Sequence, residues 1–382
     1  MTVFMNKCVW RVVVVMGIAV ILTGCGNKET KEALDKATAL QSQKEYTDAN
    51  EVLVEALQAR EEKIRADAGP PPTDPTAVDA LTKKVQSDSE ILKLERAQIP
   101  LYLHMERADM ASAVYNDILA GHPGDTIVYD TLHDSDPLLR TGAVRVLGLA
   151  GKPEAIDALA GATKDPDQDV RRAAISALGS IKDPKAVPLL IEALKDPDWF
   201  ARSESANALG LQHDARAVKP LIDTVLDTDS TVAGSAETSL LFLCKPPSTA
   251  SPDDFVSRLN DPNQKIVLVS AVCLSLLKDA RAIPVLTKLI SSTDQTTRLD
   301  AVKGLGETGD PSVIPTLRQT LKDSDVNMRG WSIIGLGKLK DQGSLADLQA
   351  LVSDDTQPDS IRAAAAAAVN NITGQSPAAN SP

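Results

Sequence analysis

The most constraining feature of this chain is a repeat that runs from Asp134 to near the C-terminus with a period close to thirty-one residues. Copies that begin at Asp165 and Asp196 both open with Asp-Pro-Asp, carry Arg six residues after the start, and reach Leu-Gly after thirteen. A fixed period of this length is typical of stacked arrays in which each unit buries its apolar face only against its neighbours. The repeat therefore predicts an extended surface that binds a partner, instead of a pocket that encloses a substrate.

The residue pattern of the repeat predicts two helices per copy. Aligned copies start near residues 134, 165, 196, 227, 261, 292, 323 and 356. An arginine recurs six residues after most of these starts, as Arg140, Arg171, Arg202, Arg298, Arg329 and Arg362. A leucine stands thirteen residues after the start, often followed by glycine, and a second apolar segment with helical spacing closes the copy. We therefore expect an all-α fold.

This residue pattern resembles the HEAT repeat, in particular the short form found in phycobilisome bilin lyases. The resemblance implies a right-handed α-solenoid of about seven to eight helix pairs over residues 134–374, with one continuous apolar core. It also implies a ladder in which a turn Asp and a helical Arg hydrogen-bond and fix the stacking. The best candidate pairs are Asp165 with Arg171, Asp196 with Arg202, and Asp323 with Arg329. We interpret the periodic arginines as structural and not as a basic binding patch.

The repeat departs from its own pattern in the fourth and fifth copies. Ala233 and Val267 stand where arginine is expected, and Leu241 stands where glycine is expected. The fourth copy also continues into a Pro/Ser segment over residues 245–252, which predicts a reshaped loop between its helices. After an Ala-rich helix near residues 362–369, which we expect to cap the array, the tail at 375–382 is expected to be disordered.

The first twenty-four residues have the features of a secretion signal. Lys7 and Arg11 supply positive charge, residues 12–22 form an apolar run too short to span a bilayer comfortably, and Leu22-Thr-Gly-Cys25 follows. This order resembles the lipobox of bacterial lipoproteins. The resemblance implies cleavage before Cys25, acylation of that cysteine with chains such as palmitate, and attachment to the cell envelope. Since Gly26 follows, it implies the periplasmic side of the outer membrane in a Gram-negative cell. The alternative is an uncleaved membrane anchor with a chance cysteine.

The charge of the chain narrows the class of partner. The formal net charge is −12, whereas binding the phosphate backbone of nucleic acid requires clustered positive charge. Docking on anionic lipid has the same requirement. We therefore expect no nucleic-acid partner, and we expect the membrane to be reached only through the acyl anchor.

The segment between the signal and the array is predicted to be helical. Residues 25–69 have the spacing of a helical hairpin, residues 70–75 read as a proline-rich linker, and residues 76–133 are helical again. Within the last range, Tyr102, Ala111, Tyr115 and Pro123 resemble a tetratricopeptide repeat, although Ile118 replaces the small residue of that family. The hairpin at 25–69 resembles a second copy. A plain helical hairpin or a coiled-coil stalk is the alternative.

The sequence contains no recognisable catalytic constellation. None of the four histidines lies in an HExxH motif, and the sequence has no Gly-rich phosphate loop, GxSxG elbow or CxxC pair. We therefore expect no enzymatic activity, no cofactor and no metal. Cys244 and Cys273 both lie in apolar segments that are predicted to be helical. They could pair in an oxidising compartment or pack as free core cysteines.

The face of the repeat helix opposite its core is the predicted binding surface. In the copy that starts at Asp165, the core face takes Val170, Ala174 and Leu178. Across copies, the opposite face and the preceding turn give the binding candidates Trp199, Phe200, Leu268, Trp331 and Ile334, and Ser203 is expected on the same exposed face. Exposed aromatic residues often anchor protein interfaces, although these could instead fill gaps in the core. The sequence thus predicts a lipid-anchored envelope scaffold that binds a protein. A subunit related to the bilin lyases and a structural spacer are the alternatives.

Overall fold

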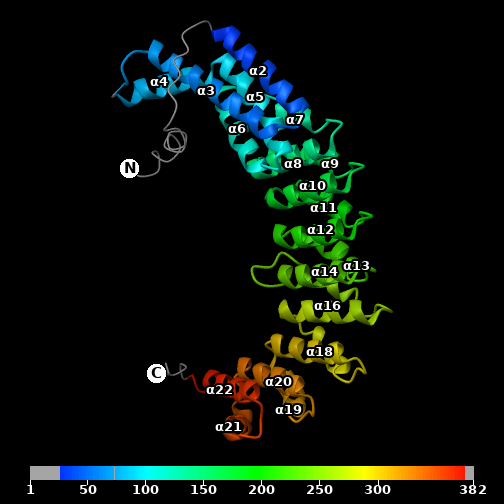
Figure 1. Cartoon of the computed structure of the whole chain (residues 1–382). Helices are drawn as coiled ribbons and strands as arrows, with labels where there is room; N and C mark the ends of the chain where they lie inside the picture. Colours follow the sequence, from blue (N-terminus) through cyan, green and yellow to red (C-terminus); the bar gives the residue numbers. More distant parts are fainter. Residues whose placement is uncertain (1–25, 73, 375–382) are drawn as a thin grey trace. The chain divides into compact units, whose positions relative to one another are not determined.

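The computed structural model describes residues 26–72 and 74–374, in which every regular element is helical and no strand occurs (Figure 1). The signal segment, Cys25 and the tail at 375–382 lie outside the described residues. The chain divides into two compact units, one up to Ala150 and one from Gly151 onward. The predicted all-α class is therefore confirmed, and each unit is described below by itself.

The first unit is a bundle of helical hairpins. Its helices are α2 (Gly26–Ser42), α3 (Tyr46–Asp67), α4 (Pro75–Gln86), α5 (Ser89–His104), α6 (Ala108–Gly121), α7 (Ile127–Thr131) and α8 (Pro137–Ala150). α3 packs on both α2 and α5, and α5 packs on α6. The prolines at 70–72 separate α3 from α4, and the Asp74 carboxylate caps α4 by accepting from the Ala77 N–H at 3.1 Å. The hairpin predicted for residues 25–69 corresponds to α2 and α3.

The core of this unit joins α3 to α5. Leu53 is fully buried there against Leu94 and Leu101. Tyr102 on α5 is also buried, as are Ala111 and Tyr115 on α6, which packs against α5. These are residues on which the tetratricopeptide resemblance rests. Their burial is equally compatible with a plain helical bundle, so the resemblance stays a prediction.

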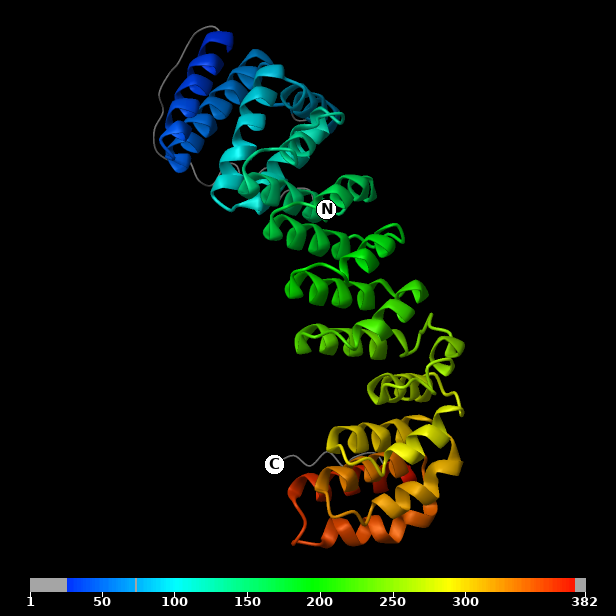
Figure 2. The same ribbon diagram turned by 90° about the vertical axis from the view of Figure 1, so that its right-hand side faces the viewer.

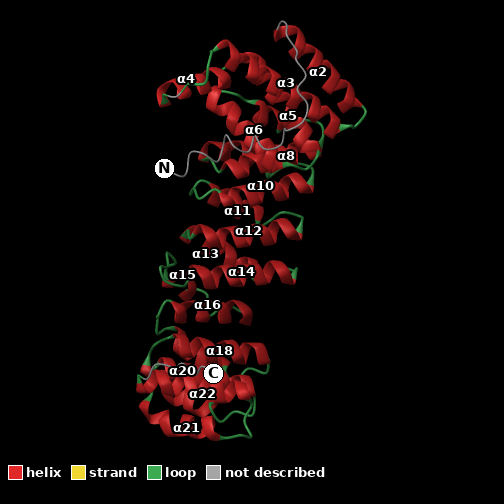
Figure 3. Cartoon of the chain, turned by 60° about the vertical axis from the view of Figure 1, so that its left-hand side comes forward, coloured by secondary structure: helices red, strands yellow, loops and turns green. Residues whose placement is uncertain are grey.

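The second unit is a stack of helix pairs in two layers. One layer consists of long helices: α10 (Gln168–Ser180), α12 (Trp199–Gln212), α14 (Ser230–Leu243), α16 (Gln264–Leu276), α18 (Gln295–Glu307), α20 (Val326–Lys338) and α22 (Asp359–Thr373). The other consists of shorter helices: α9 (Ile156–Ala162), α11 (Ala186–Ala193), α13 (Val218–Thr224), α15 (Pro252–Val256), α17 (Ala282–Leu289), α19 (Ile314–Thr320) and α21 (Leu345–Ser353). Figures 2 and 3 show successive long helices one below another, which is the solenoid that the repeat predicts.

Local sequence explains why each long helix begins where it does. In the second copy the Asp165 carboxylate accepts the Asp167 N–H at 2.9 Å, which forms the turn. Asp167 then caps α10 by accepting from the N–H groups of Asp169 and Val170. Two acidic residues at fixed spacing thus build one turn and one N-cap in this copy. The buried face of α10 carries Val170, Ala174 and Leu178, as the helical spacing predicts.

The recurring glycine allows neighbouring long helices to approach closely. A Cβ atom on Gly210 of α12 would lie 2.6 Å from Oγ and 3.0 Å from Cα of Ser239 on α14. A Cβ atom on Gly306 of α18 would lie 2.9 Å from Cα of Gly335 on α20. A larger residue at either position would have to push the two helices apart.

The stack is most sparsely packed between α14 and α16, at a junction that we call the α14–α16 joint. The contact between these two helices is the smallest between any successive long helices from α10 to α22. Leu241 replaces the glycine in α14, and the segment predicted to reshape the loop runs from α14 to the five-residue helix α15. Phe255 of α15 is completely buried. The joint therefore lacks the close backbone contact of its neighbours.

Candidate functional site

The predicted ladder joins successive copies of the repeat. Arg171 donates through Nε and Nη2 to both carboxylate oxygens of Asp196, at 2.8 and 3.1 Å, and through Nη1 to the main-chain oxygen of Asp165 at 3.0 Å. Arg202 repeats this arrangement with Asp227 and the main-chain oxygen of Asp196. The expected partners within one copy therefore meet through a backbone carbonyl, whereas the carboxylate that the guanidinium binds belongs to the next copy.

The ladder is a structural element because its charges are buried and paired. The Arg171 and Asp196 side chains are only 13% and 6% exposed. The Arg202 guanidinium lowers the pKa of Asp227, mainly by hydrogen bonding to its carboxylate. Further along, Arg329 donates to the main-chain oxygen of Asp323 at 2.9 Å and to the side chain of Gln357. Little of either the Arg171 or the Arg202 guanidinium remains available to a ligand.

The ladder changes at the two copies that depart from the sequence pattern. Ala233 contributes no guanidinium, and Arg258 from the following loop bonds Asp261 at 3.3 Å and Asp223 at 2.5 Å instead. At the next junction Val267 replaces the arginine and Ser292 replaces the aspartate, so both partners are lost together. The substitute role of Arg258 has no signal in the repeat, because this residue lies outside the aligned positions.

Two predicted binding residues form an exposed aromatic patch, which we define as Trp199, Phe200 and Arg172. Trp199 and Phe200 are the first two residues of α12, are 44% and 42% exposed, and contact each other edge to face with ring centroids 5.7 Å apart. Arg172 of α10 lies over the Phe200 ring, 5.0 Å from its centroid. The patch therefore combines two apolar rings and a cation at one end of two adjacent helices.

The arginine of the aromatic patch is held in place by a carboxylate. Arg172 donates through Nε and Nη2 to Asp198 at 2.6 and 2.7 Å, and Asp198 caps α12 by accepting from the Ala201 N–H at 3.0 Å. The hydrogen bonds from Arg172 are the main cause that lowers the pKa of Asp198 to about 2. The pair therefore stays charged at neutral pH. The repeat pattern alone did not reveal the pairing of Arg172 with Asp198, because the neighbouring copies have no arginine at this position.

The other predicted residues lie elsewhere in the stack. Leu268 is half-buried on α16, whereas on α20 Trp331 is half-buried and Ile334 is exposed. The Lys303 ammonium lies 5.0 Å from the centroid of the Trp331 ring. Since α14, α16 and α18 lie between α12 and α20 in the stack, the structure does not bring the two aromatic sites together (Figure 1).

One residue predicted on the exposed face is buried, and several exposed apolar residues were missed, among them Leu211 and Phe242. Ser203 is buried, and its hydroxyl lies 2.9 Å from that of Ser235, so its assignment to the surface was wrong. Leu211 and Phe242, by contrast, are 63% and 42% exposed near the C-terminal ends of α12 and α14. The Phe242 ring packs against His213 with centroids 4.9 Å apart. Both of these residues follow directly after the position of the recurring glycine, and that periodicity could have identified them.

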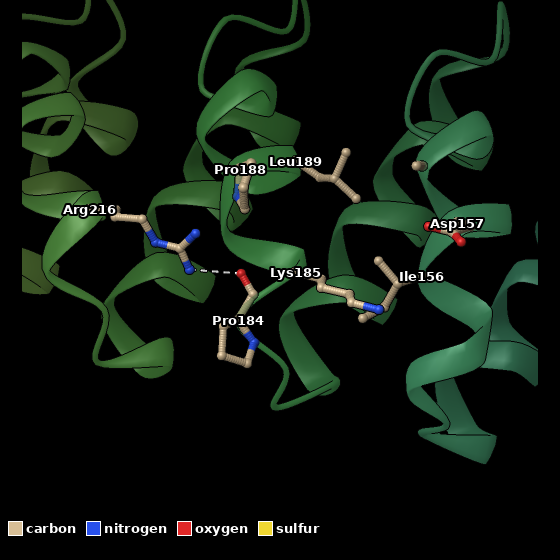
Figure 4. Close-up of a pocket in the computed structure, with 8 residues that line it drawn as sticks. Ile156, Asp157, Pro184, Lys185, Pro188, Leu189 and Arg216 are labelled. Atoms are coloured by element: carbon tan, nitrogen blue, oxygen red, sulfur yellow. Dashed lines mark hydrogen bonds between the residues drawn. The ribbon is translucent and has the colours of Figure 1, made fainter.

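A shallow groove crosses the layer of short helices (Figure 4). It is lined by Ile156, Asp157, Ala160, Pro184, Lys185, Pro188, Leu189 and Arg216. Arg216 is tied down by two carboxylate bonds to Asp214 and by donation to the main-chain oxygen of Pro184 at 2.8 Å. Its guanidinium therefore links two successive copies of the repeat.

Within residues 26–72 and 74–374, no group of three or more His, Cys, Asp or Glu side chains is arranged to hold a metal ion. Among the helices of that part of the chain, none combines the length and the apolar character that crossing a bilayer requires.

Comparison with known families identifies the array. The model of the HEAT repeats matches residues 126–174, 160–241, 252–312 and 287–370, which together exceed half of the chain. The chain belongs to the HEAT-repeat family. The gap between the second and third matches, at 242–251, coincides with the loop that precedes α15. No curated protein sequence shows a significant match.

Solved structures agree with the solenoid fold. Kap95p in a complex with RanGDP is 10% identical, with a TM-score of 0.55 over 92% of this chain and 56% of that chain. Importin beta is 14% identical, with a TM-score of 0.54 over 92% of this chain and 55% of that chain. The phycocyanin lyase complex of CpcE and CpcF from a Nostoc species is 21% identical, with a TM-score of 0.31 over 65% and 93%. At these identities, the first two show the α-solenoid fold alone.

Proposed function

We propose that this protein is a non-enzymatic, lipid-anchored scaffold of the cell envelope that binds another protein through its HEAT solenoid. The observation that carries the proposal is the aromatic patch. Two adjacent aromatic side chains, each more than two-fifths exposed, stand at the start of a helix beside a fixed guanidinium. Aromatic residues and arginine are the residue types most enriched among the anchors of protein interfaces.

The patch is preorganised for binding. Because Asp198 both caps α12 and binds Arg172, the rings start from a fixed backbone, and the cation over Phe200 has little freedom to move. A fixed surface loses less side-chain entropy on association than a mobile one. The partner that suits this chemistry presents an apolar side chain to the rings and carbonyl or carboxylate oxygens to the rim. The net charge of −12 disfavours nucleic acid as the partner.

The anchor in this proposal is Cys25. The signal-like segment and the Leu22-Thr-Gly-Cys25 sequence support it, and stable attachment requires about two acyl chains, each contributing roughly 0.8 kcal/mol per buried methylene. Mass spectrometry of the N-terminal peptide tests this part directly. We expect a diacylated or triacylated Cys25 as the first residue, and the variant Cys25→Ala to leave the membrane fraction. An unmodified peptide that begins upstream of Cys25 would refute the anchor.

Binding is tested by capture from detergent-solubilised envelope with the full-length protein. We expect a reproducible partner for the wild type and at least a tenfold loss of it for Trp199→Ala combined with Phe200→Ala. The matched control is Leu211→Ala combined with Phe242→Ala, which removes apolar side chains at least as exposed as Phe200 from the C-terminal ends of α12 and α14. Equal capture by both double variants would contradict the assignment of the patch. A wild type that captures no reproducible partner would favour the structural spacer.

A further inference from the structure

His104 contacts two other segments of the first unit. It is the last residue of α5, and its side chain is only 14% exposed. Its ring stacks on the ring of Tyr46, the first residue of α3, with centroids 4.6 Å apart and an interplanar angle of 13°. Its Nε2 atom lies 3.6 Å from a carboxylate oxygen of Asp136, in the turn before α8. The ring therefore lies where the helical hairpins meet the first copy of the repeat.

One hydrogen bond determines which ring nitrogen of His104 carries the hydrogen in the neutral form. Nδ1 lies 2.8 Å from the main-chain oxygen of Pro100. Because a carbonyl oxygen only accepts hydrogen bonds, Nδ1 is the donor, and Nε2 of the neutral ring has a lone pair but no hydrogen. That lone pair faces the Asp136 carboxylate, which also only accepts when it is ionised. The neutral ring therefore leaves this contact unsatisfied, whereas a proton on Nε2 makes it an ion pair.

The surroundings of the ring also favour its charged form. At the C-terminal end of α5, the ring lies at the negative end of the helix dipole. A charged imidazole stacked on Tyr46 is attracted by the aromatic face. These two interactions and the Asp136 carboxylate all act in the same direction.

The other charged groups near this end of α5 are engaged elsewhere or exposed. α4 packs near Ile91, at the far end of α5. On the elements that pack on the near end, the charged residues are Lys44, Glu45 and Asp48 around the start of α3, Glu106, Arg107 and Asp109 around the start of α6, and Asp134 and Arg140 around the start of α8. Arg107 binds Asp109 at 3.1 Å, and Arg140 donates to the main-chain oxygens of Asp134 and Ser135. Asp136 is therefore the carboxylate that faces the ring.

We propose that protonation of His104 strengthens the contact between the helical hairpins and the first repeat copy, so that this contact responds to pH. In the protonated state the Nε2–H group binds the Asp136 carboxylate. Asp136 also accepts the Leu138 N–H at 2.9 Å, so the added ion pair stabilises the start of α8.

The direction of the pH dependence follows from the two charges. The ion pair forms as the pH falls through the range in which an imidazole takes up its proton, and it is lost as the pH rises through that range. It is lost again only in strong acid, where the Asp136 carboxylate is protonated too. Mildly acidic conditions therefore hold the turn before α8 most firmly on the end of α5.

Hydrogen exchange of the full-length protein, read by mass spectrometry, tests this proposal. Exchange is measured at about pH 5 and about pH 8 in peptides from α8, and each intrinsic rate is divided by the measured rate to give a protection factor. We expect the protection of α8 in the wild type to be about threefold higher at the lower pH, as a single partly exposed ion pair allows. In His104→Gln this pH dependence should disappear, because glutamine does not titrate.

A second variant and a matched control complete the experiment. Asp136→Asn keeps an oxygen for the Leu138 N–H but loses the charge, so it should lose most of the pH dependence even if His104→Gln does not fold. His133→Gln is the control, because His133 is an exposed histidine in the same turn, and it should behave as the wild type.

Three results would overturn the proposal: a wild type whose protection does not change with pH, a full pH dependence in His104→Gln or Asp136→Asn, or its loss in His133→Gln. Capture of a partner does not enter this test, so its result is independent of the proposed scaffold function.

Discussion

Two stretches of one array use different means to stay together. From α10 to α14, each junction has a buried arginine that binds the carboxylate of the next copy, and a glycine that brings the helices close. From α14 to α18, the arginines are replaced by Ala233 and Val267, and the glycine of α14 by Leu241. The second stretch has instead the bonds of Arg258 to Asp261 and Asp223, and the completely buried Phe255 of α15.

The recurring arginine and glycine residues connect successive copies, and the loss of one such residue changes only the junction in which it lies. Where the arginine is missing at Ala233, the acceptor Asp261 is retained and takes a new donor. Where Val267 replaces the arginine, the acceptor is also gone, as Ser292. Since a buried carboxylate without a partner is costly, each junction avoids an isolated charge by one of these two routes.

The largest effect should come from breaking a regular junction. Arg202→Ala removes the bidentate partner of Asp227, whose side chain is only 13% exposed, and we expect the free energy of unfolding to fall by about 3 kcal/mol. The variant Arg258→Ala should cost less, about 2 kcal/mol, because Arg258 makes only one bond of 3.3 Å to Asp261, whose side chain is likewise 13% exposed, and its shorter bond goes to Asp223, whose side chain is 63% exposed. Urea unfolding of the two variants measures both values. Equal losses would show that the two stretches do not differ in this way.

Gly210→Ala should reveal the close approach of α12 and α14. Alanine normally stabilises a helix interior relative to glycine by about 1 kcal/mol. At Gly210, however, the new Cβ would lie 2.6 Å from the Ser239 hydroxyl oxygen, and we expect a net loss of about 2 kcal/mol. Gly234→Ala is the matched control, because no atom lies within 4 Å of its Cβ position, and it should stabilise the protein. If both substitutions change stability in the same direction, close packing is not the function of Gly210.

The sequence was sufficient for the architecture because periodicity determines which face of a helix is buried. Val170, Ala174 and Leu178 follow the helical spacing and form the core face of α10. The same periodicity does not state which neighbour a side chain reaches. The offset between Asp165 and Arg171 suggested one copy, whereas the stacking places the Arg171 guanidinium on the carboxylate of the copy after it.

The aromatic patch shows the same limit for the candidate site. The scarcity of aromatic residues drew attention to Trp199 and Phe200, but Arg172 lies twenty-eight positions before Phe200 and has no conspicuous sequence context. Only the close stacking of α10 on α12 brings its guanidinium onto Asp198 and the Phe200 ring. Contacts of this kind depend on the distance between two copies, which no single copy encodes.

The ion pair between Arg172 of the aromatic patch and Asp198 should make the stability of the protein depend on pH. The pKa of Asp198 is lowered from 3.8 to about 2, mainly by its hydrogen bonds from Arg172 and also by backbone N–H donors. The pair therefore contributes fully above pH 4, and its contribution is lost as the pH falls from about 4 to 2. Arg172→Gln should therefore lower stability by about 1–2 kcal/mol at pH 7 and by much less near pH 2. Urea unfolding of both proteins at several pH values measures the difference. A loss of stability that does not depend on pH would contradict the pairing of Arg172 with Asp198.

The smallest effect is expected at the second aromatic site. The Lys303 ammonium and the Arg172 guanidinium lie at the same distance of 5.0 Å from their ring centroids, yet Arg172 is also bound to a carboxylate by two hydrogen bonds. Lys303→Gln should therefore cost only about 0.5 kcal/mol, the value typical of an exposed cation over an aromatic ring. If this substitution costs as much as Arg172→Gln at pH 7, the carboxylate adds nothing to the first site. The preorganisation that distinguishes the Trp199 patch from the Trp331 site would then be refuted.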